Sequence, residues 1–185
     1  MGDPGTKEPL SLEDLEAVGR ITTGRKHVIS LLVENRPGVL TRVAGMFARR
    51  NFNIDTLAVG PTQDMQFSRI TVTLDGADHY IDQVIKQLHK LVNVIKISDL
   101  EPKDTVTREM ALFKVAADGQ TRSELMQIVD VFRGKVVDLS KRSVTIEITG
   151  SWDKLEAFEQ MVRPFGLIEM VRTGEIALRR GKGTT

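Results

Sequence analysis

The chain has 185 residues, enough for one medium domain or two small ones. Its formal net charge is +1, which argues against a nucleic-acid-binding surface. It contains no cysteine, so disulfides, thiolate zinc sites and a cysteine nucleophile are excluded. No apolar run reaches the roughly 18 residues of a membrane span, and the polar start does not resemble a signal peptide, so we expect a cytoplasmic protein.

Residues 1–25 are predicted to be an N-terminal extension. Two glycines and two prolines within the first nine residues interrupt regular structure, whereas Ser11 to Glu16 are compatible with one or two helical turns. Chain ends are often poorly ordered, so a disordered extension and a short helix both stay open. We assign no function to this segment.

The first regular pattern runs over residues 26–101. Predicted strands at 27–33, 54–59, 70–74 and 92–100 are separated by apolar stripes at helical spacing over 39–50 and 81–91. The order β-α-β-β-α-β is that of a ferredoxin-like unit, in which two helices cover one face of an antiparallel sheet. We expect the other face to be solvated or paired with another sheet.

A polar linker at 101–104 precedes a second unit, which we expect over residues 105–174. Its predicted strands lie at 110–117, 136–139, 144–149 and 165–171, and its predicted helices lie around 125–132 and 155–162. The predicted fold class is therefore α+β, with two tandem ferredoxin-like βαββαβ domains. Residues 175–185 are basic, and we expect them to form a loose tail.

The strongest local motif is the run Glu34-Asn35-Arg36-Pro37-Gly38-Val39-Leu40, between the first predicted strand and helix. Pro37 favours helix entry, and Gly38 lets a ligand approach the backbone. The N–H groups at the helix start, from about Val39 onward, carry a partial positive charge that suits a carboxylate. The motif therefore indicates a site for a small anion.

Two asparagines flank this motif in the predicted fold. The amides of Asn35 and of Asn53, at the start of the second strand, each offer a donor and an acceptor to the charged groups of an amino acid. Taken alone, an Asn-x-Pro-Gly run is more commonly a capped turn than a ligand site.

The run from Glu34 to Leu40, with Asn53-Ile54 about fifteen residues later, resembles the amino-acid-binding signature of ACT domains. The serine-sensing domain of phosphoglycerate dehydrogenase has a similar run with a histidine at the position of Val33, so the aliphatic residue here favours an aliphatic effector. The resemblance implies a set of effector-binding residues: Asn35, Pro37, Gly38, Val39, Leu40, Asn53 and Ile54.

A more specific resemblance covers about residues 26–181 and is to the small subunit of bacterial acetohydroxyacid (acetolactate) synthase. The similar segments, in chain order, are 28–40, 53–57, 86–91, 108–112, 132–134, 163–166 and 172–174. The extension at 1–25 departs from the family pattern. The first unit is then identified as an ACT domain and the second as ACT-like.

The resemblance implies a non-catalytic regulatory subunit that acts in branched-chain amino acid biosynthesis. Such a chain would activate a catalytic large subunit, form a homodimer, and bind valine at an ACT dimer interface for feedback inhibition. Thiamine diphosphate, Mg and FAD would be held only by the catalytic subunit, and neither nucleic acid nor membrane would be a partner. The preference among valine, leucine and isoleucine, and the stoichiometry, stay open.

The second unit lacks the Asn-x-Pro-Gly run. Asp118-Gly119-Gln120 occupies the equivalent first turn and offers a carboxylate where the carboxylate of a ligand would have to sit. We therefore expect this unit not to bind valine, and to dock on the catalytic subunit or extend the dimer.

Three other functions share this predicted fold. An acylphosphatase-like enzyme needs a glycine-rich anion loop that is absent here, and an RNA-binding module needs aromatic residues on the open sheet face, where only Phe67 is available. A stand-alone ACT transcriptional regulator stays as the alternative function. No catalytic residue is proposed, and His27, His79 and His89 are too far apart in sequence to predict a metal site.

Overall fold

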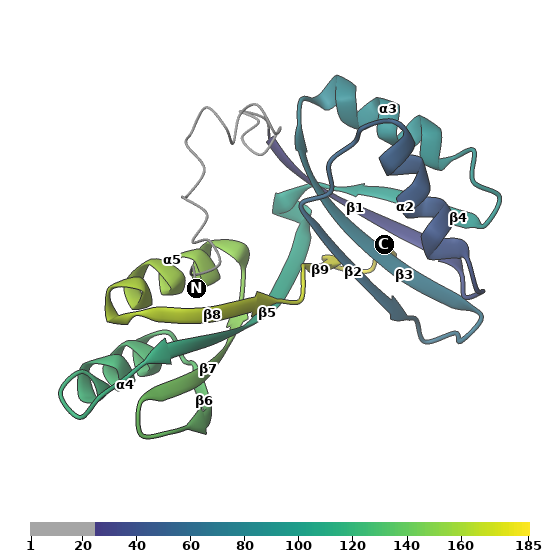
Figure 1. Ribbon diagram of the computed structural model, residues 1–185. Helices are drawn as coiled ribbons and strands as arrows, with labels where there is room; N and C mark the ends of the chain where they lie inside the picture. The colour runs from purple at the N-terminus through teal and green to yellow at the C-terminus, as the bar shows by residue number, and fades with distance from the viewer. Residues whose placement is uncertain (1–24) are drawn as a thin grey trace, which may run out of the picture.

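The computed structural model describes residues 25–185, which form two α+β units (Figure 1). The extension predicted over 1–25 lies outside the described residues apart from Arg25, with which the first strand begins. Each unit is an antiparallel sheet with two helices on one face, as predicted from the periodicity.

The first unit has the predicted βαββαβ order. Its elements are β1 (Arg25–Glu34), α2 (Val39–Arg49), β2 (Thr56–Pro61), β3 (Phe67–Gly76), α3 (Asp78–Leu88) and β4 (Val94–Leu100). The strand order across the sheet is β2-β3-β1-β4, so β1 and β3 are central and β2 is an edge strand. This order places the β1–α2 turn beside the β2–β3 hairpin, where Glu34 pairs with Phe67.

Alternation along the central strands builds the first core. Ile70, Val72 and Leu74 on β3 are at most 1% exposed and face α2 and α3, whose buried residues recur at helical spacing. The polar residues between them, such as Thr71 and Thr73, point to the opposite face of the sheet. The one-sided core explains why this unit was predictable from its sequence pattern.

The second unit repeats the arrangement after a short 3-10 turn, Pro102–Asp104. Its elements are β5 (Thr105–Ala116), α4 (Arg122–Val131), β6 (Lys135–Leu139), β7 (Ser143–Gly150), α5 (Trp152–Val162), a second 3-10 turn (Arg163–Phe165) and β8 (Leu167–Arg172). The order across the sheet is β6-β7-β5-β8. Phe158 is the centre of its core, in edge contact with the rings of Phe113 at 5.0 Å and Phe132 at 5.3 Å.

The segment expected to be a loose tail is partly a strand, so that prediction was wrong. Residues Ile176–Arg179 form β9, which pairs antiparallel with Thr105–Arg108 at the start of β5. The chain end is fastened too, because Lys96 Nζ donates to Thr184 O at 2.8 Å. Only four residues of β9 pair, and their partners on β5 lie far away in the sequence. No periodic pattern in the sequence therefore predicted this strand.

The β5–β9 ribbon lies against the face of the first sheet that carries no helix (Figure 1). Val28, Leu100 and Ala177 form a small core there, and Ser30 and Thr71 are at most 2% exposed. The sequence pattern predicts that this face is solvated or paired with another sheet. The chain covers part of it with its own C-terminal segment.

Candidate functional site

The turn between β1 and α2 is fastened to the β2–β3 hairpin by Asn35. Its backbone N–H donates to Gln66 O at 2.7 Å, and its side-chain Nδ2 donates to Met65 O at 2.9 Å. Asn35 therefore braces the turn within its own chain, as a capping asparagine does. A contact with a ligand would fall to the rest of its amide, which lies at an exposed position.

Gly38 is the N-cap of α2 and has a left-handed backbone, with φ 83°. Glycine adopts this conformation without strain, which explains its place here. An added Cβ would meet nothing within 4 Å, no side chain caps the helix, and the first turn holds no acidic residue. The start of α2 is thus open space bordered by helix N–H groups, which suits an anion.

The first N–H of this helix is not free, in contrast to the prediction from the sequence. Val39 N donates to Arg36 O at 3.3 Å, so donors to a ligand would begin at Leu40. The Val39 side chain is 5% exposed and packs in the first core, whereas Leu40 is 43% exposed. Val39 therefore holds the helix in place, and Leu40 offers the accessible apolar group.

A polar network that the sequence analysis missed supports the turn. Asn93 Nδ2 donates to Glu34 Oε2 at 2.6 Å, Arg42 Nη1 donates to Asn93 Oδ1 at 2.7 Å, and Arg36 lies 3.7 Å from the same carboxylate. The exposed position of Arg42 one turn after Gly38 was a visible signal. The pairing with Asn93 was not, because 51 residues separate the two in sequence.

A hollow of about 370 Å³ opens beside this network. It is lined by Glu34, Asn35, Arg36, Gln66 and Phe67. It joins the turn motif to the hairpin and has both a carboxylate and a guanidinium on its wall. Charged groups of both signs are what a zwitterionic amino acid requires.

The second part of the predicted site, Asn53-Ile54, precedes β2. Phe52 anchors it through an edge contact with Tyr80 at 4.8 Å, and Ile54 is half-buried against the first core. Asn53 Nδ2 donates to Asp55 Oδ1 at 3.2 Å. Burial, reinforced by the nearby Asp75, raises the pKa of Asp55 above its ordinary value despite that hydrogen bond.

Within one chain the two parts of the site are far apart. Gly38 precedes α2 and Asn53 follows it, and 11 helical residues rise by about 16 Å. A single amino acid cannot reach both ends of such a helix. The predicted set of residues therefore belongs to one ligand site only if a second chain supplies the other half.

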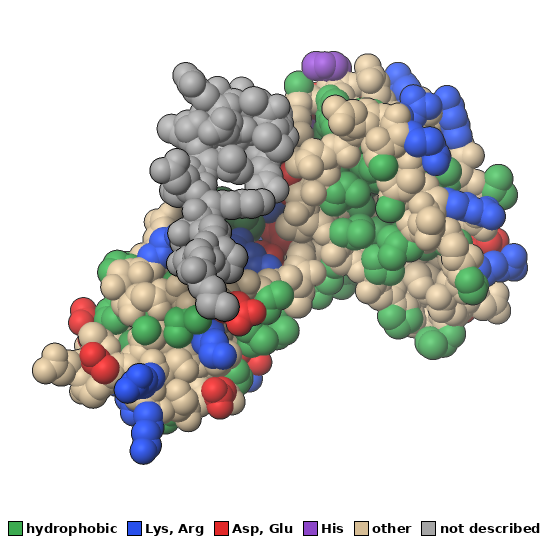
Figure 2. Space-filling view, in the orientation of Figure 1, with side chains coloured by type: hydrophobic (Ala, Val, Ile, Leu, Met, Phe, Trp, Pro, Cys, Tyr) green, Lys and Arg blue, Asp and Glu red, His purple; other side chains and the backbone are tan. Residues whose placement is uncertain are grey.

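The surface near these residues has the character of an interface. Leu40 on α2 and Val59 on the edge strand β2 are 43% and 48% exposed, and Figure 2 shows apolar side chains gathered over these two elements. An edge strand with exposed apolar neighbours is a surface that tends to pair with another chain.

Val33 cannot provide the aliphatic effector contact that the sequence comparison suggested. Its side chain is 1% exposed and lies in the first core beneath the helices. Among the predicted residues, Leu40 and Ile54 are left as the accessible aliphatic groups. The argument for an aliphatic effector therefore depends on them and not on Val33.

In the second unit a carboxylate of the chain lies in the turn just before α4, and Glu124 lies in the first turn of that helix. Asp118 Oδ1 accepts from the backbone N–H of Gln120 and of Thr121 and from the Thr121 hydroxyl, each at 2.9 Å. These hydrogen bonds hold the pKa of Asp118 below its ordinary value. A ligand carboxylate would be repelled beside these groups.

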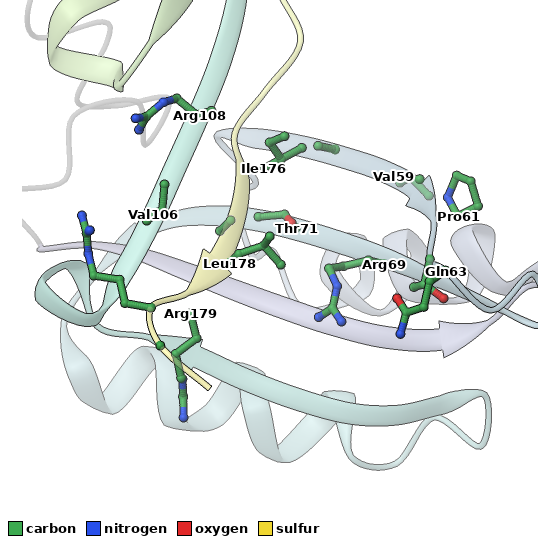
Figure 3. A pocket seen from close by; sticks show the side chains of 16 residues that line it. Val59, Pro61, Gln63, Arg69, Thr71, Val106, Arg108, Ile176, Leu178 and Arg179 are labelled. Atoms are coloured by element: carbon green, nitrogen blue, oxygen red, sulfur yellow. The ribbon is translucent and has the colours of Figure 1, made fainter. Parts of the chain in front are cut away.

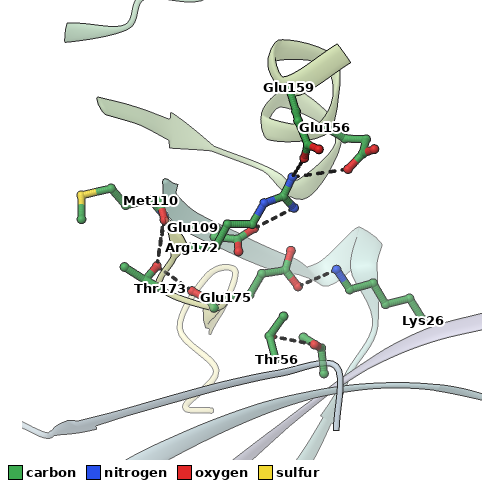
Figure 4. A network of polar contacts seen from close by, with 11 residues as sticks. Lys26, Thr56, Glu109, Met110, Glu156, Glu159, Arg172, Thr173 and Glu175 are labelled. Carbon is green, nitrogen blue, oxygen red and sulfur yellow. Dashed lines mark hydrogen bonds and ion pairs between the residues drawn. The ribbon is translucent and has the colours of Figure 1, made fainter. Parts of the chain in front are cut away.

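A charged cluster lies where β8 leaves the second sheet and turns toward the first (Figure 4). The Arg172 guanidinium lies 3.9 Å from Glu109, 3.3 Å from Glu156 and 3.1 Å from Glu159. Burial raises the pKa of Glu109, and Arg172 opposes that shift. Nearby, Lys26 on β1 pairs with Glu175 at 3.2 Å, so ion pairs join β1 to the segment after β8.

Among residues 25–185, no three His, Asp or Glu side chains gather as metal ligands would. No helix in the same range is long and apolar enough to cross a membrane.

Comparison with known proteins gives consistent matches over both units. Residues 29–96 match the family described as the AHAS small subunit-like ACT domain, and residues 108–181 match the family described as the small subunit of acetolactate synthase.

Individual relatives match over nearly their whole length. The probable acetolactate synthase small subunit of Methanothermobacter thermautotrophicus is 46% identical over 159 residues, which are 85% of this chain and 95% of that protein. The acetolactate synthase small subunit of Mycolicibacterium smegmatis is 47% identical over 84% of this chain and 91% of its own length. The crystal structure of the acetolactate synthase small subunit from Thermotoga maritima superposes with a TM-score of 0.79 at 42% identity, over 86% of this chain and 99% of that one.

Proposed function

This chain belongs to the family of acetolactate synthase small subunits, and we propose that it is the non-catalytic regulatory subunit of that enzyme, which valine inhibits by binding to this chain. In this proposal it binds the catalytic large subunit and raises its activity. Thiamine diphosphate, Mg and FAD are assigned to the catalytic subunit and none of them to this chain.

The assignment of a valine site to the first unit rests on the difference between the starts of α2 and α4. At α2 the space over Gly38 is open and no acidic group lies in the first turn, whereas α4 has Glu124 in its first turn and Asp118 in the turn just before it. Helix N–H groups stabilise the carboxylate of a ligand, but carboxylates of the chain beside the same helix start repel it. Valine is therefore assigned to the first unit alone.

We infer that the complete site forms between two copies of the chain. Asn35, Gly38 and Leu40 of one copy would face Asn53 and Ile54 of the other, because α2 separates these groups within one chain. A two-fold dimer contains two such sites, since each surface contacts its own counterpart. The exposed apolar groups on α2 and β2 support this pairing.

Inhibition requires that valine bind one state of the complex more tightly than another. Coupling between a regulatory and an active site is typically about 1–3 kcal/mol, which changes affinity roughly 5- to 150-fold. The β5–β9 ribbon and the Lys26–Glu175 pair supply contacts through which the first unit and the second could bias each other.

Reconstitution with the catalytic subunit tests the proposal. Acetolactate formation from pyruvate should be absent with this chain alone, higher with both subunits than with the catalytic subunit alone, and lowered again by valine. Leucine and isoleucine, titrated in parallel, give the effector preference. Acetolactate formation by the isolated chain, or a catalytic subunit indifferent to it, would contradict the proposal.

A further inference from the structure

A groove runs along the corner between the first sheet and the β5–β9 ribbon (Figure 3). Its volume is about 870 Å³, and it lies on the sheet face opposite the helices. Its floor consists of small residues on β2 and β3, such as Ala58, Gly60 and Thr71. The groove is therefore separate from the helix start proposed to bind valine.

One wall of this corner groove is aliphatic. In the ribbon Val106 pairs with Leu178 and Arg108 pairs with Ile176, so these four side chains share one face. Ile176 and Leu178 are 62% and 61% exposed, whereas Ala177 between them is buried against the first sheet. Two exposed aliphatic side chains on a two-stranded ribbon are unfavourable in water unless another molecule covers them.

The close approach of the ribbon to the sheet depends on Gly174. Its φ is +82°, and an added Cβ would lie 3.1 Å from Leu57 O on β2. A residue with a side chain would push the start of β9 away from β2. The chain thus forms the corner through a specific backbone contact.

The rim of the groove is also basic. Its lining contains Arg69, Arg108, Arg179 and Arg180 but no aspartate or glutamate, although the net charge of the whole chain is only +1. None of the four forms an ion pair with another residue in the described range 25–185. The binding partner should therefore carry acidic groups beside its aliphatic ones.

A second copy of this chain does not meet that requirement. A two-fold contact through this surface would bring the four arginines of one groove against the same four of the other, which is repulsive. Nucleic acid fits poorly as well, because the lining has no aromatic ring for base stacking and the wall is aliphatic. The observations favour a protein segment.

We propose that the corner groove is a docking surface for an acidic, aliphatic segment of the catalytic subunit. This inference rests on the proposed function, because it assumes that the catalytic subunit is the partner. The aliphatic wall would bury the apolar side chains of that segment, and the arginines would pair with its carboxylates.

The chain has one internal competitor for this role. Residues 10–16, Leu-Ser-Leu-Glu-Asp-Leu-Glu, combine leucines with acidic residues. The Thermotoga maritima small subunit matches this chain over 99% of the chain in its crystal structure while covering only 86% of this one, so the extension has no counterpart in that structure. Nearly all the groove residues lie within 29–96 and 108–181, the ranges that match the family, so we favour a partner outside this chain.

The experiment measures binding of the full chain to the catalytic subunit by calorimetry. The groove variant Arg108→Glu with Arg180→Glu reverses two exposed charges, and the control Lys86→Glu with Lys90→Glu makes the same change on and just after α3. We expect the Kd of the groove variant to rise about tenfold or more, as at close interfacial charge pairs, and that of the control to stay within about twofold of the wild type. Added salt should weaken wild-type binding more steeply than binding of the groove variant.

Further variants keep the test decisive. Two more variants are the double variant Arg108→Gln with Arg180→Gln and the single variant Leu178→Ser. Both should weaken binding at the groove without reversing a charge. Valine binding by each variant shows that the first unit is folded. A groove variant that binds the catalytic subunit as tightly as the wild type overturns the inference. Suppose that the groove variant binds as tightly as the wild type, and that it and a chain without residues 1–24 shift the thermal unfolding temperature by the same amount. The groove then holds the N-terminal segment instead.

Failure of this inference and failure of the proposed function give different results. A wild-type chain that does not bind the catalytic subunit removes the proposed function. A wild-type chain that binds it, together with groove variants that bind equally well, removes only the assignment of the groove.

Discussion

Replacing Gly38 by aspartate should abolish valine binding while leaving the first unit folded. The position has φ 83° and open space where a Cβ would lie, so the Cβ of the new side chain meets no atom. The left-handed conformation costs most residues roughly 1–2 kcal/mol, and aspartate and asparagine tolerate it better than others. The free energy of unfolding should therefore fall by about 1 kcal/mol or less.

The effect on binding should be much larger. At an effective dielectric constant of about 20, two like charges repel by about 4 kcal/mol at 4 Å and about 2 kcal/mol at 8 Å. A carboxylate at position 38 should therefore weaken valine binding by about 30- to 1,000-fold, since 1.4 kcal/mol is tenfold. Loss of inhibition should follow, with activation of the catalytic subunit retained.

Gly38→Asn is the matched control. Asparagine has the shape of aspartate and tolerates positive φ, but it carries no charge. Calorimetric titration of both variants with valine separates charge from size. Binding by Gly38→Asp at the wild-type Kd, or equal loss in the two variants, would refute the reasoning that a ligand carboxylate sits at this helix start.

Three further predictions concern the second unit and its charged cluster, each measured by calorimetric unfolding. Phe158→Ala should cost about 3–5 kcal/mol, comparable with the stability of a small domain, and lower the unfolding transition of the second unit while valine binding persists. Arg172→Met should cost about 3–5 kcal/mol because it leaves Glu109 and Glu156 without their cation and Glu159 with Arg163 alone, whereas the exposed Arg163→Met should cost less than about 1 kcal/mol because Glu159 keeps Arg172. Burial raises the pKa of Glu109 above 4.5, so Glu109→Gln should raise the free energy of unfolding at neutral pH, and this gain should vanish as the pH falls below 4.5, where the wild-type side chain is protonated in both states. A gain that persists there would contradict the burial argument.

Deleting residues 105–185 is a poorer test of the second unit than Phe158→Ala. The deletion would also remove the β5–β9 ribbon, which covers Val28 and Leu100 on the first sheet. A defect in valine binding would then reflect the exposed face of the first sheet and not the loss of the second core. The point variant leaves that cover in the chain.

The elements that could be predicted from the sequence are those with one buried face. Ile70, Val72 and Leu74 alternate with polar residues because β3 is covered on one side only, and the α2 stripe ends in the buried Met46 and Phe47. The turn motif was also found from sequence, because Pro37 and Gly38 mark a helix start by their backbone chemistry. These features are local, so a single sequence contains them.

Features that depend on distant pairing could not be predicted in the same way. β9 has exposed aliphatic residues and finds its partner at the start of β5, so its alternation did not distinguish it from a loose tail. Val33 belongs to the first core because of its register on β1, which the motif comparison did not reveal. Arg172 gathers carboxylates from β5 and α5, which lie together only in the folded chain.

Mixing two inactive variants tests most directly the claim that valine binds between two chains. Gly38→Asp and Asn53→Ala should each lose binding, because every site in either homodimer has one damaged half. Co-expression of the two gives heterodimers with one intact and one doubly damaged site, so a random mixture should recover about a quarter of the wild-type valine sites. Recovery of that fraction by calorimetry is the predicted result. No recovery in a mixture shown to contain heterodimers would contradict the shared site.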